Sequence, residues 1–172
     1  SSIFVGDDTI VYRSFMTGDP HPRECLLVYP EGMTDSAFLS EYVVKPLSQL
    51  SLAPGLWGAK LSEFLSEQAL PVSGVEERTL LAEVVDEVLT GDAALFVDGC
   101  AAAFIIRSKK LTLRPPSEPQ SESVVRGPRE GFGESLTVNT TLIRRRIRSP
   151  KLKFNFLQLG QQTHTKVAVA YI

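Results

Sequence analysis

The chain has 172 residues, of which 43% are hydrophobic and 22% are charged, a composition typical of a folded globular protein. Its length suits one ordinary domain or two small subdomains. No apolar run approaches the roughly 20 residues that a membrane-spanning helix needs.

The net charge of −2 conceals an uneven distribution. Residues 107–153 hold 12 Lys and Arg against 4 Asp and Glu, an excess of +8, whereas the rest of the chain holds 6 against 16, an excess of −10. This asymmetry indicates an acidic partner, an anionic surface, or contact between the two parts of the chain. Nucleic acid is not predicted as a partner, because no aromatic residues interleave the basic run and no known binding motif is present.

Two strands are predicted first, over residues 9–15 and 24–29, joined by the polar, proline-rich turn TGDPHPR. A helix is expected from about Ser36, with Pro46 kinking or ending it because proline lacks the N–H of the i−4 bond. Its buried stripe would consist of Phe38, Leu39, Tyr42, Val43, Leu47 and Leu50. A short helix over residues 59–68 comes next.

Ser73 and Glu76 stand at the spacing of a capping box, which predicts a helix from there through about Leu89. Its apolar face would consist of Leu80, Leu81, Val84, Val85, Val88 and Leu89. Farther on, the pair Asp98-Gly99 separates two apolar runs and predicts a β-hairpin with a type I′ turn. A polar linker then closes a first subdomain at about residue 115.

Residues 126–144 read RGPREGFGESLTVNTTLIR and combine a rigid turn, a charged loop and the start of a helix. Arg126 and Arg129 can pair with a carboxylate, and Glu130 can meet an amine, so the loop suits a small polar molecule such as a free amino acid. The helix N-terminus just beyond would add N–H groups for an anion. The alternative is that Arg129 and Glu130 pair internally, hold the loop, and bind nothing.

The helix after this loop has an apolar face and a basic end. The face would consist of Phe132, Leu136, Thr140, Ile143 and Ile147. The last turn is crowded by Arg144, Arg145, Arg146 and Arg148. We interpret this run as a solvated face that complements the helix dipole.

The last residues echo the first hairpin. Shifting residues 12–29 forward by 142 positions lays them on residues 154–171 without a gap, and Gly18 then falls on Gly160. Two-stranded hairpins share generic patterns, so chance similarity competes with duplication as the explanation. Duplication predicts that a second unit opens here and is incomplete in this chain.

Several segments together resemble one known family. The stretch RGPREGF, followed by ESL, an Asn and then IRRRI, is similar to the A subunits of spore germinant receptors of the GerA type. The segments LVYPEGMTD, GDAALFVDGCAAAFII, EPQSESVV and LKFNFLQLGQQTHTKVAVAYI extend the resemblance over most of the chain. Gly133 departs from the family pattern, as does Gln161-Gln162.

The resemblance implies a soluble N-terminal part of a membrane protein, so that Ile172 would not be a natural terminus. It implies a complex with B and C subunits in the spore inner membrane, which senses nutrients and triggers germination. The expected fold class is α/β, with two small α/β subdomains whose β-hairpins pack on helices, the second being incomplete. Residues 1–115 would form the first subdomain, and residues 116–172 the linker, loop, helix and opening hairpin of the second.

Enzymatic chemistry is not expected. The sequence has no nucleophile elbow, P-loop or H-E-x-x-H motif, and His21 and His164 both lie in polar turns. No cofactor or metal site is predicted. Cys25 and Cys100 are interpreted as free, half-buried thiols, although the sequence leaves a disulfide open.

Two functional hypotheses remain. In one, a nutrient binds in a cleft between the subdomains, lined by Arg126, Arg129 and Glu130. In the other, the chain is an assembly or coupling module that contacts neighbouring subunits while another subunit binds the nutrient. A flat patch with an apolar centre would favour the second hypothesis.

Overall fold

The computed structural model describes residues 3–72, 74–110 and 131–172. The strands are β1 Ile10–Met16, β2 Glu24–Pro30, β3 Val75–Arg78, β4 Ala93–Val97, β5 Ala103–Ile106, β6 Lys153–Leu159 and β7 Thr165–Tyr171. The helices are α1 Ser36–Leu39, α2 Lys45–Gln49, α3 Gly58–Phe64, α4 Leu81–Leu89 and α5 Leu136–Arg146, with π-helical segments η1 Ser40–Val44 and η2 Leu65–Ala69. The mixed α/β class expected from the sequence is confirmed.

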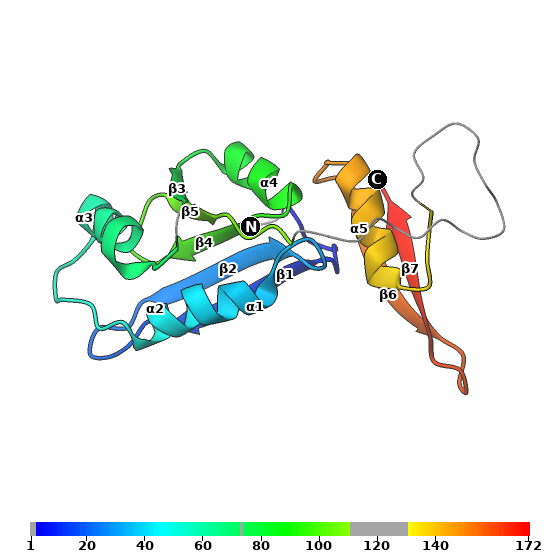
Figure 1. Ribbon diagram of the computed structural model, residues 1–172, viewed down its shortest axis with the longest axis horizontal. Coiled ribbons are helices and arrows are strands. Elements are labelled where there is room, and N and C mark those ends of the chain that lie inside the picture. The colour runs from blue at the N-terminus through cyan, green and yellow to red at the C-terminus, as the bar shows by residue number, and fades with distance from the viewer. Residues whose placement is uncertain (1–2, 73, 111–130) are drawn as a thin grey trace.

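A five-stranded antiparallel sheet in the order β1-β2-β4-β5-β3 forms the centre of the first part of the chain (Figure 1). Because successive strand residues point to opposite faces, Cys25 and Leu27 of β2 join one apolar core and Val28 joins the other. The segments α1–η1–α2 and α3–η2 cover the first face. Among the described helices, α4 covers the second face, where it packs on β4, β2, β5 and β3.

The strands β6 and β7 form a separate two-stranded sheet next to α5 (Figure 1). Their register reproduces that of the first hairpin after the predicted shift of 142 residues: Tyr12 pairs with Val28, and Phe154 pairs with Ala170. The hairpin echo in the sequence therefore extends to strand pairing. The subdomain boundary at residue 115 lies outside the described residues and stays a prediction.

The helix predicted from Ser73 through Leu89 is wrong in its first half. Residues Val75–Arg78 form β3, which pairs with β5, and α4 begins only at Leu81. Glu76 does not cap a helix, because its carboxylate accepts hydrogen bonds from Arg107 and Arg78. Four buried residues of the predicted face are confirmed, but Leu80 and Leu81 are exposed.

Two local predictions are corrected by the backbone. Pro46 does not end its helix: it lies in α2, which follows the π-helical segment η1 directly and runs on to Gln49. In η1 the N–H of Lys45 bonds to the carbonyl of Ser40, five residues earlier, which shifts the bonding pattern ahead of the proline.

The hairpin at residues 98–99 is confirmed, but its turn is not type I′, because Gly99 has a positive φ of 91° and Asp98 does not.

The helix α5 also differs from the prediction. Phe132 precedes the helix and is exposed, and Ile147 is exposed at its end. The buried residues of α5 are Thr140 and Arg144. The interpretation of the whole arginine run as solvated is therefore wrong at Arg144, whose side chain enters the protein because it pairs with the buried carboxylate of Asp7.

Candidate functional site

The predicted ligand-binding residues Arg126, Arg129 and Glu130 lie outside the described residues, whereas the segment between them and α5 is described from Gly131 onward. Ser135 is the N-cap of α5 and accepts a hydrogen bond from the N–H of Val138. Asn139 makes a pair of hydrogen bonds with Gly133, accepting from its N–H at 2.9 Å and donating to its carbonyl at 2.8 Å. The residues between the predicted loop and α5 are thus tied back to the helix.

Arg144 lies at a junction between α5, the N-terminal residues and the second hairpin. Its side chain is only 2% exposed, and its Nη2 donates to the carboxylate of Asp7 at 2.5 Å and to the hydroxyl of Thr9 at 2.9 Å. The guanidinium also lies 5.0 Å from the ring centre of Phe154. Burial lowers the pKa of Arg144, and the Asp7 carboxylate opposes that shift.

Backbone contacts reinforce this junction. The N–H of Asp8 bonds to the carbonyl of Phe154 at 2.8 Å, and the Asp8 carboxylate accepts from the N–H of Phe156 at 2.7 Å. Lys153 donates to the carbonyl of Ile3 at 2.6 Å. Residues more than 130 positions apart are therefore held together by an ion pair and by backbone hydrogen bonds. No local pattern in the sequence predicts these contacts.

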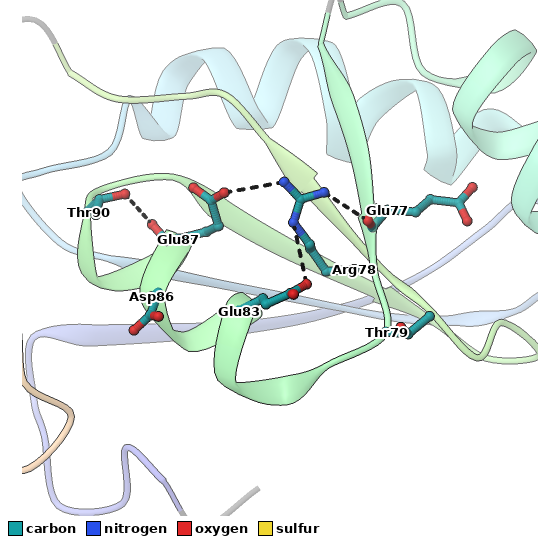
Figure 2. Close-up of a pocket in the computed structure, with 7 residues that line it drawn as sticks. All are labelled: Glu77, Arg78, Thr79, Glu83, Asp86, Glu87 and Thr90. Atoms are coloured by element: carbon teal, nitrogen blue, oxygen red, sulfur yellow. Dashed lines mark hydrogen bonds and ion pairs between the residues drawn. The ribbon is translucent and has the colours of Figure 1, made fainter.

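A charged hollow lies between β3 and α4, as Figure 2 shows. Its lining residues are Glu77, Arg78, Thr79, Glu83, Asp86, Glu87 and Thr90. In the centre, Arg78 extends from β3 toward the carboxylates of Glu83 and Glu87 on α4, at 3.8 and 3.6 Å (Figure 2). Asp86 is directed away from Arg78 in this view.

Beside the hollow, Arg107 joins three carboxylates. Its Nη1 lies 2.6 Å from Glu87 and 2.7 Å from buried Asp92, and its Nη2 lies 2.8 Å from Glu76. These bonds, with Glu87 first, raise the pKa of Arg107. Hydrogen bonds from Arg107 and then Arg78 hold the pKa of Glu76 below its usual value. The network is occupied by its own ion pairs, so we assign it a structural role in holding α4 against β3 and β5.

An apolar groove lies on the other flank of α4. It has a volume of about 270 Å³ and is lined by Ile3, Phe4, Leu26, Val28, Leu81, Val84, Val85, Val88, Ala94 and Phe96. Leu81 in its lining is 50% exposed, and Met16, on the same face of neighbouring β1, is 48% exposed. The apolar face predicted for α4 therefore included most of the α4 side of the groove. No pattern in the sequence predicted that the groove would be open to solvent.

Other site chemistry is limited in the part of the chain that the structure describes. No cluster of three or more His, Cys, Asp or Glu residues there could hold a metal ion. Cys25 is buried and Cys100 is half-buried, and both are free thiols, which decides the question that the sequence left open. Burial raises the pKa of Cys25 to about 12 and that of Cys100 to about 11. In the same residues, no helix is long and apolar enough to cross a membrane.

Comparisons with known proteins agree with one another. The family described as Bacillus/Clostridium GerA spore germination protein matches residues 1–172. Spore germination protein B1 of Bacillus subtilis strain 168 is 35% identical over 167 residues, covering 96% of this chain and 33% of the relative. Stage V sporulation protein AF of the same strain is 42% identical over 152 residues, covering 87% of this chain and 30% of the relative.

A solved structure has a similar fold. The N-terminal domain of the A subunit of the Bacillus megaterium spore germinant receptor GerK3 superimposes with a TM-score of 0.69 and 22% identity, covering 99% of this chain and 60% of that one. The chain spans about a third of the length of the curated relatives described here.

Proposed function

Because the chain belongs to the Bacillus/Clostridium GerA spore germination protein family and has a role in spore germination, we propose that it is an assembly module of a germinant receptor A subunit. In this proposal the full-length protein works with the receptor's B and C subunits in the spore inner membrane. The module couples nutrient sensing to germination without catalysing a reaction.

The observation that carries the proposal is the apolar groove beside α4. The larger charged hollow contains ion pairs that satisfy one another, so a ligand would have to break them. The groove instead is apolar: Leu81 in its lining is exposed, and Ile3, Leu26 and Phe96 are half-buried. Burying the apolar surface that they still expose would release about 25 cal/mol per Å². Among the described residues, this groove is the feature that best fits a contact surface, because it is apolar and partly open to solvent.

Nutrient binding at the predicted loop is the second candidate. The Asn139–Gly133 bonds favour it, because they fix the residues after the loop beside the N-terminus of α5. If Arg129 contacts a nutrient or partner, Arg129→Ala should impair germination while the melting temperature of the chain changes little. A collapsed melting curve would instead indicate a structural arginine, and unchanged germination would remove Arg129 from any functional site.

The assembly proposal is tested in spores that carry the full-length protein. Leu81→Ser removes an exposed apolar side chain from the groove, and Tyr42→Ser removes an exposed ring from the opposite side of the sheet as a matched control. We expect Leu81→Ser to reduce recovery of the B and C subunits with a tagged A subunit, and to slow nutrient-triggered germination, at normal A-subunit levels. Wild-type recovery and germination for both variants would refute the assembly role.

A further inference from the structure

The sheet has room for one more helix on the α4 face. Five strands at about 4.8 Å spacing span roughly 19 Å between the outer strands, and packed helices lie about 8–10 Å apart, so about two helices fit on each face. The first face carries two helical segments, α1–η1–α2 and α3–η2. On the second face α4 packs over β4, β2, β5 and β3, and it is the one helix that the described residues place there (Figure 1). Among the same residues, the groove between α4 and β2 is bordered by the N-terminal Ile3 and Phe4 and by no second helix.

The orientation of α4 shows which flank is open. Glu87 turns toward Arg78 of β3 and Arg107 at the end of β5, so that flank is closed by ion pairs. The other flank therefore faces β2 and β1. There the groove floor is formed by Leu26 and Phe96, both only half-buried. A volume of about 270 Å³ is roughly twice the 150 Å³ cavity that admits benzene, so the groove can take two apolar side chains.

The start of α4 is built in an unusual way. Its N-cap is Leu80, which is 61% exposed and makes no side-chain capping bond. Leucine is disfavoured at this position by about 1 kcal/mol relative to serine, threonine, asparagine or aspartate. Two exposed leucines, Leu80 and Leu81, therefore follow one another at the start of α4, and Leu81 lines the groove. Neither is needed to begin the helix or to fill the core, which fits a role in contacting another molecule.

Charge at the rim restricts what that molecule can be. Glu24 precedes Leu26 by two residues and Asp98 comes two residues after Phe96, so both acidic residues flank the same end of the groove, and both are exposed. At the opposite end, the Lys153 ammonium is bonded to the Ile3 carbonyl. An anionic lipid surface would be repelled by this acidic rim, whereas a basic peptide would be attracted.

From these observations we propose that the groove between α4 and β2 receives an amphipathic helix of a partner protein, with its apolar stripe on the sheet and Lys or Arg on its flanks. The helix lies beside α4 over β1 and β2 and completes the second layer on this face. This inference rests on the assembly function proposed above and adds the chemistry of the partner segment.

The test uses the 172-residue chain and two synthetic helical peptides, each about 18 residues long. One carries leucines at every third or fourth position and lysines elsewhere, and its twin carries glutamates in place of the lysines. Binding is measured by calorimetry and located by NMR chemical shifts. We expect the lysine peptide to bind, to shift the resonances of Leu26, Val85 and Phe96, and to lose affinity at least about tenfold with Leu81→Ser. Tyr42→Ser should leave binding unchanged, and Glu24→Gln, which removes an exposed charge from the acidic end of the groove, should weaken it several-fold.

Other results would overturn the proposal. Equal binding of both peptides would remove the charge selection, and shifts confined to the charged hollow would place the contact elsewhere. Binding to anionic vesicles but to neither peptide would indicate a lipid surface, and dimerisation through the groove would indicate a second copy of the chain. If Leu81→Ser disrupts the receptor in spores while the lysine peptide fails to bind, the assembly function stands and the basic helix is wrong. If the peptide binds in the groove while Leu81→Ser leaves recovery of the B and C subunits and germination unchanged, the assembly function is wrong.

Discussion

Replacing the buried Arg144 tests whether charge fixes the second hairpin to the N-terminal residues. Arg144→Met keeps a long apolar side chain but removes the partner of the buried Asp7 carboxylate. Removing one member of a buried ion pair costs about 3–5 kcal/mol, because the remaining charge is uncompensated. For a chain of this size each kcal/mol lowers the melting temperature by about 2–4 °C, so a fall of about 6–20 °C is expected.

The double variant separates charge from packing. When Arg144→Met is combined with Asp7→Asn, no buried charge remains at this junction. The side-chain carbonyl of the introduced asparagine can still accept from the N–H and hydroxyl of Thr9, as Asp7 does. Removing Arg144 also removes its Nε and Nη1, which are buried without a hydrogen-bond partner. The double variant should therefore be more stable than either single variant. The exposed Arg148→Met is the matched control and should change stability by less than about 0.5 kcal/mol.

Urea unfolding followed by circular dichroism gives all four free energies of unfolding and the coupling energy of the pair. A change below about 1 kcal/mol for Arg144→Met would show that the buried charge of Asp7 does not need this partner. If the loss of unfolding free energy in the double variant equals the sum of the losses in the two single variants, the reasoning is also contradicted. Additivity would mean that the two charges do not interact.

Three other predictions concern a glycine, a carboxylate and the two thiols. Gly32→Ala should lower the free energy of unfolding by about 1–3 kcal/mol, because φ is +78° and the new Cβ would lie 2.7 Å from a threonine hydroxyl of α5. Gly133→Ala is the control: it has open space around it and should change the free energy of unfolding in urea little. The lowered pKa of Glu76 stabilises the fold at neutral pH and this contribution is lost as the pH falls through that lowered value, so the melting-temperature gap between wild type and Glu76→Gln should shrink below the ordinary glutamate pKa of about 4.3. A constant gap would contradict the arginine bonds as the cause. Because thiolate is the reactive form, Cys25 and Cys100 should react with a thiol reagent at pH 8 at least about 100-fold more slowly in the folded chain than in urea, and equal rates would contradict their burial.

Local patterns predicted those parts of the fold that local contacts determine. The first hairpin was predicted from two strand-like runs joined by a polar, proline-rich turn, and the buried face of α4 was predicted from its helical spacing. The sequence VEER at β3 has no such pattern, because Glu76 can begin a helix as readily as it can pair across a sheet. This segment forms a strand because it pairs with β5 and because Glu76 accepts hydrogen bonds from Arg107, 31 residues farther along the chain.

The functional surfaces were harder to predict for the same reason. Arg144 looks like its exposed neighbours in the sequence, and only Asp7, 137 residues away, distinguishes it. The groove beside α4 arises because one helix of the described residues covers a face that has room for two. The spacing of apolar residues along a single helix does not indicate what covers the rest of the sheet.

The most direct test of the assembly role is hydroxyl-radical footprinting of the full-length receptor in spore membranes, compared with the 172-residue chain alone. We predict that labelling of Met16 and Leu81 falls in the receptor, because a partner helix covers the groove. Labelling of Trp57, exposed on the other side of the sheet, should stay the same and serves as the control. Equal labelling of Met16 and Leu81 in the two samples would show that the groove stays open in the receptor and would contradict the assembly role.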